Sequence, residues 1–470
     1  MFKTLRYKAI ICASAVLFLG ACKEALDTEP RSSMSEETVV TPQYARQLMN
    51  GAYDRMQNVS YYGRDYQVVS DVGGDDVKIT ADNSNRFLSE FRYLYSSNTA
   101  AQTNTWSYIY KTIYAANNII NSLPEDQATS EYKGEAYFVR ALGHFDLLRR
   151  WARPFTNVSA KPDEANSGIP LVLEKVQDPQ SFLPKRSTLR ESYAAVIADL
   201  KKAQELGRDA TQGSDAIFRG SKQSATALLV RVYLYMGDWD NVIAESNKLI
   251  GKFSLWEPGS VVNAFKSNKT SEEIFTLKFI ATESLGADNF GYIYLPKGLG
   301  YGDVRPGSNW ISLLGPSDVR SGFLEDEGGI TYLSKFPENG EGAVGLVDLK
   351  VLRIAEIYLS RAEAYAEKGD ISSALTDLNA LRTKRGLSSF VSTSISAVKD
   401  EIKKQRRLEL IGEGHRMFDI FRKNDTRVIT DANALSVSPI APDNFRVIYP
   451  IPVSELDANP NVVQNPGYVQ

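Results

Sequence analysis

Apolar residues recur every three or four positions along much of the chain, the spacing that places them on one face of a helix. Residues 106–123 and 135–150 both show this pattern. Thr188 and Glu191 have the spacing of a capping box, which begins a helix that we expect to run to Leu206. The periodicity therefore predicts a mainly α protein.

Two distant stretches repeat one pattern of a tyrosine, a glycine and an aspartate. Tyr233 precedes Gly237 by four positions, and Tyr365 precedes Gly369 by the same distance. An aspartate follows each glycine, and a second apolar period begins after it. Glycine suits the turn that ends one helix, and aspartate caps the start of the next. This arrangement is typical of tetratricopeptide helix pairs, which repeat every ~34 residues.

The helical repeats occupy two regions, about 106–250 and about 350–421. Between them an insert, about 252–345, is rich in Gly, Pro, Asn and aromatic residues and holds only short strand-like pieces such as 274–280. Loops of this length in a compact protein are usually functional or disordered. We therefore expect one body over 43–470, a superhelix of tetratricopeptide-like helix pairs with a loop-rich, ligand-facing part.

The N-terminal residues have the pattern of a bacterial export signal. Three cations precede the apolar run 9–19, which is too short to cross a bilayer but suits a signal peptide. Small residues then lead to Cys22, as in a lipobox. We predict a lipoprotein signal peptide over 1–21, a lipidated Cys22, and a flexible polar tether over 22–42. The alternative is an ordinary signal peptide with a chance cysteine.

The composition excludes several classes of function. The chain has 470 residues and a net charge of −3, so it carries no broad basic field for nucleic acid. Its two cysteines lie in the signal and at the lipidation position, and its two histidines, His144 and His415, are far apart. A thiol nucleophile, a disulfide, a multi-histidine metal site and a Ser-His-Asp triad are therefore disfavoured. We expect no cofactor and no metal, and structural roles for both histidines.

Two groups of acidic residues could have a catalytic or a metal-binding role instead of a structural one. Glu409, Glu413, Arg416 and Asp419 are spaced to share a helix face, although glycines at 412 and 414 can interrupt it. Paired carboxylates suit a glycosidase, but neighbouring arginines would keep both ionised, so we favour a structural ion-pair network.

The second acidic group lies in the stretch SDVGGDDVKITADN. Its aspartates, Asp71, Asp75, Asp76 and Asp82, could hold calcium but lack the spacing of an EF-hand. We therefore favour a solvated acidic turn.

Aromatic residues beside polar donors are the candidates for ligand contact. A sugar offers an apolar ring face for stacking and hydroxyls for hydrogen bonds. The glycine-rich stretch KGLGYGDVRPGSNW and the stretch SYYGRDY supply such residues. The candidates are Tyr301, Arg305, Asn309 and Trp310, with Trp310 as the main platform, and then Tyr61 and Tyr62. The alternative is that these aromatic side chains only pack the loops.

Several motifs in order along the chain resemble one family. The lipobox is followed by LDTEP, NGAYDRM, RALGHFDLLRRWARPF, EIYLSRAEAYAEKGD, RRLELIGEGHRMFDIFR and YPIPVSELDANPNVVQNPGY. Together they resemble the SusD/RagB outer-membrane lipoproteins of the Bacteroidota, from the signal to the last residues.

The resemblance implies a function without catalysis. Such a protein is lipid-anchored in the outer membrane, faces the cell exterior, and captures oligosaccharides, less often peptides, for a SusC-like TonB-dependent transporter. Two alternatives stay open at this point: a surface-anchored glycoside hydrolase, and a tetratricopeptide scaffold that holds other proteins.

Overall fold

The computed structural model describes residues 41–124, 126, 129–176 and 181–469. The predicted signal peptide, Cys22 and nearly all of the tether lie outside the described residues. The described helices of the first half are α2 (Pro42–Met56), α3 (Asp65–Val72), α4 (Leu88–Arg92), α5 (Ala100–Ser122), α6 (Ser130–Trp151) and α7 (Leu189–Leu206). Those of the second half are α8 (Lys222–Met236), α9 (Trp239–Asn247), α10 (Ser308–Ile311), α11 (Ile354–Glu367), α12 (Ile371–Lys384), α13 (Ile395–Leu410), α14 (Arg416–Arg422) and α15 (Val453–Ala458).

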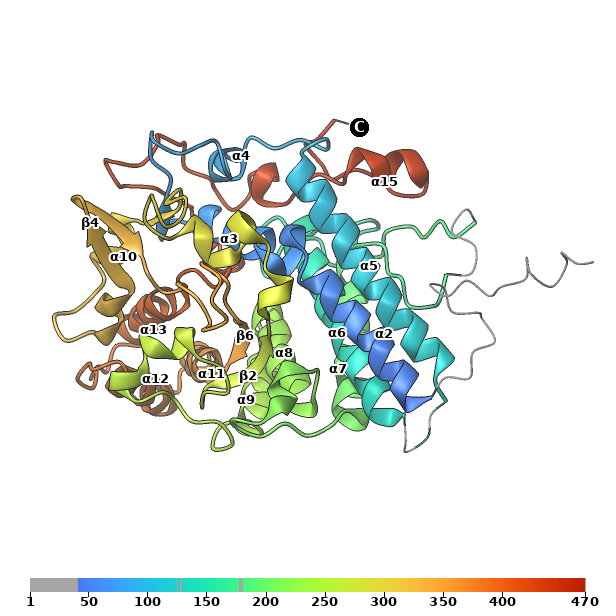
Figure 1. Ribbon diagram of the computed structural model, residues 1–470, viewed down its shortest axis with the longest axis horizontal. Helices are drawn as coiled ribbons and strands as arrows, with labels where there is room; N and C mark the ends of the chain where they lie inside the picture. Colours follow the sequence, from blue (N-terminus) through green and yellow to red (C-terminus); the bar gives the residue numbers. More distant parts are fainter. Residues whose placement is uncertain (1–40, 125, 127–128, 177–180, 470) are drawn as a thin grey trace, which may run out of the picture. The chain divides into compact units, whose positions relative to one another are not determined.

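The long helices pack as antiparallel neighbours in chain order. Helix α2 packs on α5, α6 packs on both α5 and α7, α8 packs on α9, and α11 packs on α12 (Figure 1). The predicted mainly α fold of tetratricopeptide-like helix pairs is thus confirmed. The capping box is also present, because the Thr188 hydroxyl accepts from the Glu191 amide and the Glu191 carboxylate accepts from the Thr188 amide.

The two predicted turns have the backbone that the repeat pattern requires. Gly237 ends α8 with φ of 70°, and Gly369 follows α11 with φ of 81°. This left-handed region costs a glycine little and other residues more. Asp238 and Asp370 then cap α9 and α12 by accepting from the backbone amide three residues later.

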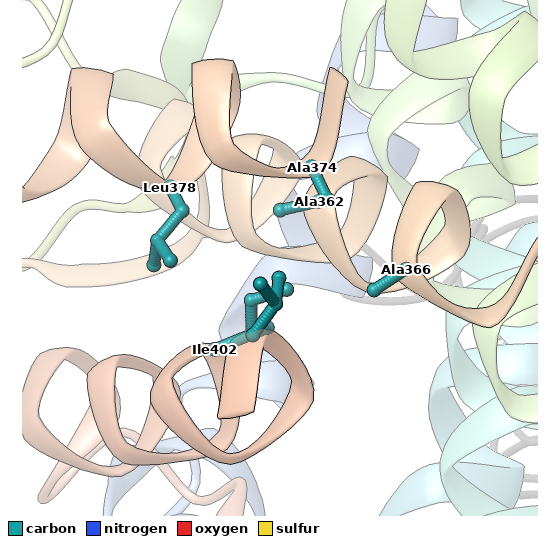
Figure 2. Close-up of a cluster of buried hydrophobic side chains, with 6 residues drawn as sticks. Ala362, Ala366, Ala374, Leu378 and Ile402 are labelled. Atoms are coloured by element: carbon teal, nitrogen blue, oxygen red, sulfur yellow. The ribbon is translucent and has the colours of Figure 1, made fainter. Parts of the chain in front are cut away.

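A small apolar cluster packs helix α13 against the pair α11 and α12. Alanines on α11 and α12 let these two helices approach closely, and side chains of α13 fill the groove beneath them (Figure 2). The cluster comprises Ala362, Ala366, Ala374, Leu378, Val398 and Ile402, each no more than 2% exposed.

The described strands form three antiparallel pairs. These are β1 (Val77–Lys78) with β3 (Arg305–Pro306), β2 (Glu273–Leu277) with β6 (Leu349–Arg353), and β4 (Leu324–Glu327) with β5 (Ile330–Leu333). Strand β2 overlaps the strand-like piece 274–280 that the sequence predicts, beginning one residue earlier and ending three residues earlier. Its pairing with β6 brings the start of the insert beside the start of α11.

The stretch from Glu409 to Asp419 is not one helix, contrary to the expectation of a shared face. Helix α13 ends at Leu410, and Gly412 and Gly414 have φ of 77° and 76°. Helix α14 begins only at Arg416. The glycines therefore break the helix and place the acidic residues on separate elements.

Candidate functional site

Two loops from distant parts of the chain meet at the pairing of β1 with β3. We call residues 79–94 the first loop and residues 286–304 the second loop. The first loop follows β1 and the second precedes β3, and Lys78 pairs with Arg305 in the antiparallel ladder. The ladder therefore fixes where the two loops leave the body of the protein.

A buried aspartate of the second loop holds the first loop in place. Asp303 is 3% exposed, and its carboxylate accepts from the Ser84 hydroxyl at 2.6 Å and from the Arg86 guanidinium at 3.2 Å. At the edge of the site, Arg305 donates to the carboxylate of Asp82 at 2.6 Å. These charge-assisted bonds are stronger than neutral ones, so the two loops form one surface.

An aromatic and cationic stack lies on this surface. The Arg86 guanidinium carbon is 3.3 Å from the centre of the Tyr301 ring. Tyr301 contacts Tyr292 edge to face, with ring centres 4.9 Å apart, and both tyrosines are half-buried. Leu299, beside them in the chain, is 58% exposed. The stack therefore combines ring faces with hydrogen-bond donors at the protein surface.

The first loop stores backbone strain beside the stack. Phe87, next to Arg86, has φ of 56°, which is uncommon for a residue with a bulky side chain; Asn85 on the other side has φ of 68°, which asparagine adopts more readily. Such residues persist where the surrounding structure holds them, and they cluster at ligand-binding sites. The Phe87 ring lies under the guanidinium of Arg64, at 5.4 Å. The strain supports a functional role for the first loop.

The chemistry of this surface suits a ring-shaped polar ligand. Tyrosine and phenylalanine rings can stack on the apolar face of a sugar, while guanidinium, amide and hydroxyl groups bond its hydroxyls. We call the surface formed by Ser84, Arg86, Phe87, Tyr292, Leu299 and Tyr301 the loop face.

The sequence-predicted residues of the insert divide between surface and interior. Tyr301 lies on the loop face. Arg305 is 5% exposed, and its hydrogen bond to Asp82 links β3 to the first loop. Asn309 is half-buried and donates to the carbonyl of Val428 at 3.1 Å. Ligand binding by these residues stays a prediction, and Tyr301 is the one of the three that lies on the loop face, with Arg86 over one face of its ring.

Trp310 is fully buried, contrary to the setting expected of a main platform. Its exposure is 0%, and its indole nitrogen donates to the Arg407 carbonyl at 3.1 Å. A ring enclosed in this way has no face for a ligand in this conformation. The structure instead gives Trp310 a packing contact between α10 and α13.

Tyr61 and Tyr62 also lie in the core. They are 0% and 1% exposed and pack against Tyr66, with ring centres 5.6 Å from it. The Tyr61 hydroxyl donates to Asp146 at 2.6 Å. Burial raises the pKa of both tyrosines well above the usual value. The pair thus supports α3 and α6 in this structure.

Sequence reasoning missed Arg86, Phe87 and Tyr292. Their signal was weak, because an arginine and a phenylalanine in a polar turn are ordinary until the second loop lies against them. A search for an aromatic residue near asparagine and arginine would have selected the first loop, where Asn85 and Arg86 directly precede Phe87.

The acidic stretch around β1 is not a solvated turn, so that expectation is wrong for three of its aspartates. Asp71, Asp75 and Asp76 are at most 8% exposed. Asp75 pairs with Arg416 at 2.6 Å, while Asp71 accepts from the amide of Gly414. Burial raises the pKa of Asp71 and of Asp76. Within the described ranges no three His, Cys, Asp or Glu side chains gather as metal ligands.

The carboxylates at 409 and 413 belong to a buried ion-pair network, as predicted. Glu409 accepts from Arg385 at 2.8 Å and from Arg353 at 3.0 Å, and Glu413 accepts from Arg353 at 2.6 Å. Burial opposes ionisation of Glu409, but the arginines outweigh it and hold its pKa well below the usual value. A carboxyl group that stays ionised is poorly suited to donate a proton to a leaving group.

The histidines are buried and lack the setting of a catalytic base. Burial lowers the pKa of His144 to about 3, and that of His415 well below the usual value. The Nε2 atom of His144 accepts from the Val172 amide at 3.3 Å. Both side chains are therefore neutral components of the core near pH 7.

Among the described helices, none has the length and apolar character needed to span a bilayer. The fold and the loop face define a class: a helical-repeat protein that presents a loop surface for ligand binding.

Comparisons with known proteins place the chain within this class. A model of the SusD family matches residues 326–468, and a model described as "starch-binding associating with outer membrane" matches residues 24–234. SusD-like protein P38 of Formosa agariphila is 24% identical, with 96% of each chain covered. The starch-binding protein SusD of Bacteroides thetaiotaomicron is 31% identical over 26% of this chain.

Solved structures agree with the sequence matches. The crystal structure of a SusD superfamily protein from Bacteroides thetaiotaomicron has a TM-score of 0.82 and 27% identity, covering 91% of this chain and 100% of that one. The chain belongs to the SusD family.

Proposed function

We propose that this protein binds carbohydrate on the loop face and performs no catalysis. One observation carries the proposal: the Arg86–Tyr301 stack lies at the surface where two loops are fixed by a buried aspartate. A family model and a relative are both described as starch-binding, which supports the ligand class. The ionised, arginine-paired Glu409 and the buried histidines support a role in capture rather than in bond cleavage.

The cellular role that we propose is capture before import. A lipid on Cys22 would hold the protein in the outer membrane, facing the exterior, and the polar tether would let the body stand away from the lipid. The oligosaccharide, or a peptide in its place, would then pass to a SusC-like TonB-dependent transporter. Family membership and the description "associating with outer membrane" support this role.

The binding proposal can be tested with native gels that contain single polysaccharides. Starch, laminarin, xylan and galactomannan form the panel, and retarded migration identifies a bound glycan. Tyr301→Ala should weaken binding by about tenfold, since a lost aromatic contact is worth roughly 1–2 kcal/mol and ~1.4 kcal/mol is a factor of ten.

The matched control is Tyr108→Ala. Tyr108 is also a half-buried tyrosine beside a cation, but it is not part of the loop face and lines neither hollow beside α5, so its replacement should leave migration unchanged. Equal retardation of wild type and Tyr301→Ala would contradict the assignment of the loop face. New reducing ends released from the bound glycan, and lost in Glu409→Gln or Glu413→Gln, would favour the glycoside hydrolase instead.

A further inference from the structure

Helix α5 carries a stripe of aromatic rings that the loop face does not use. Trp106, Tyr110 and Tyr114 follow one another at intervals of four residues, so they share one face of the helix. With a rise of 1.5 Å per residue, successive residues of the stripe are about 6 Å apart along the helix axis. The rings of Trp106 and Tyr110 are in contact, with centres 4.9 Å apart.

The stripe lies between two hollows in the protein surface. The first has a volume of about 550 Å³ and lies between α5 and α15, with Arg55 of α2 in its wall. The second has a volume of about 320 Å³ and reaches Pro170, Phe182 and Pro184. Both hollows are lined by Tyr110, Tyr114 and Glu455, so they form one continuous groove, which we call the α5 groove. Volumes of this order are typical of small-ligand sites.

Hydrogen bonds fix the floor of the α5 groove. The Trp106 indole donates to the Glu455 carboxylate at 3.2 Å, which joins α5 to α15. The Tyr110 hydroxyl donates to the Pro170 carbonyl at 2.8 Å. Trp106 is 4% exposed and supports the half-buried Tyr110 from below, so Tyr110 is held in position before any ligand arrives, which reduces the entropy lost on binding.

Tyr114 gives the groove its exposed ring. It is 43% exposed, and it is the aromatic member of the large exposed apolar side chains found in the described part of the chain. Its exposure leaves part of the ring in contact with water, so a ligand that covers the ring would remove apolar surface from water. A tyrosine at the shared wall of two hollows is well placed to contact a ligand that extends across both.

The α5 groove contains a few charged side chains of both signs and a few hydroxyl groups. Arg55, Lys111 and Glu455 are its charged side chains, and hydroxyls of Thr103, Ser107 and Ser454 accompany them. This set offers donors and acceptors to hydroxyl groups without a strong field of one sign. The described residues that line the groove lie on helices, at the end of α15 or in the segments 170–176 and 182–184. None of them belongs to β1–β6, so none offers the edge of such a strand for pairing with a peptide.

We propose that the α5 groove is a second binding site for neutral oligosaccharide. The inference shares its ligand class with the proposed function and rests on it to that extent, but its residues are separate from those of the loop face. A chain long enough to reach both sites would bind more tightly than a short one, because the second contact is made at a high effective concentration. The groove would thus favour polymers over their short fragments.

Calorimetry with a short sugar separates the two sites. The probe is the tetrasaccharide of whichever panel polysaccharide retards the wild-type protein most. We expect two binding sites per wild-type chain. Tyr114→Ala should weaken one of them by about five- to tenfold, Tyr301→Ala should weaken the other by about tenfold, and the control Tyr108→Ala should change neither. In polysaccharide gels, Tyr114→Ala should weaken retardation by about five- to tenfold. Thermal melting should be unchanged, because the Tyr114 side chain is exposed.

Each other result has a defined meaning. A single wild-type site that depends on Tyr301 and is unchanged in Tyr114→Ala would overturn the second site and leave the loop face standing. A single site that depends on Tyr114 alone would support the groove and overturn the loop face. Retention by no polysaccharide would contradict both proposals. Binding of an octaproline peptide in place of the tetrasaccharide, lost in Tyr114→Ala, would show that the groove is a peptide site.

Discussion

Replacing Glu409 by glutamine removes one charge from the buried network and keeps the shape of the side chain. The Glu409 carboxylate accepts from Arg385 twice, at 2.8 Å each, and from Arg353 at 3.0 Å. The side chains of these three residues are at most 3% exposed. The substitution therefore leaves buried guanidinium groups without one of their counter-charges.

The loss of unfolding free energy depends on which counter-charges the two arginines keep. Removing one partner of a buried ion pair costs about 3–5 kcal/mol. Glu272 still accepts from both Arg353 and Arg385, at 2.7 Å each, so a value near the lower end, about 3 kcal/mol, is expected. The loss should be accompanied by little change in the denaturant slope, because the buried surface stays the same.

Urea unfolding followed by circular dichroism measures this loss. Glu325→Gln is the matched control, since Glu325 is exposed on β4, and it should change stability by no more than about 0.5 kcal/mol. The folded-state pKa of Glu409 is lowered, so its contribution is complete above the unfolded value of about 4.3. That contribution is lost only as pH falls through the folded-state pKa. A Glu409→Gln variant as stable as the control would refute the view that this buried network stabilises the fold.

Three further predictions concern the turns, the insert and the anchor. Gly369→Val should lower the unfolding free energy by about 1–3 kcal/mol, because φ is 81° and the backbone would be strained; no atom lies within 4 Å of an added Cβ, so a steric clash is not the cause. Gly259→Ala, in equally open space without a positive φ, is the control, and urea unfolding measures both. Trp310→Ala should cost about 3–5 kcal/mol in the same assay, while unchanged stability would mean that its burial contributes nothing. Cys22→Ala should release the protein from the membrane fraction and abolish fatty-acid labelling, and equal labelling of the variant would rule out the lipid anchor.

The helix pairs could be predicted from the sequence because the residues that form each turn are close together along the chain. The left-handed glycine and the capping aspartate at 237–238 and at 369–370 lie within one turn, so a short window contains the whole signal. The helix break between Glu409 and Asp419 was visible as glycines at 412 and 414. The sequence did not show whether they would take positive φ, because that depends on the surrounding packing.

The site was harder to predict because its partners are distant in sequence. Trp310 appeared available for a ligand, but the carbonyl that accepts its indole proton belongs to Arg407, 97 positions later. The acidic stretch appeared solvated, yet Asp75 meets Arg416 across 341 positions. Tyr301 of the glycine-rich loop lies on the loop face, and its binding of a ligand stays a prediction. Arg86 could be found only from the fold, because the second loop that lies against it is more than 200 positions away in the sequence.

The central claim is that the loop face binds a sugar. Its most direct measurement is a crystal structure of the protein soaked with the tetrasaccharide of the polysaccharide that it retains. The account predicts a sugar ring stacked on the loop face at Tyr301, with hydroxyls bonded to groups of the first loop such as Arg86 or Asn85. Sugar bound elsewhere on the protein, with the loop face empty at saturating concentration, would contradict it.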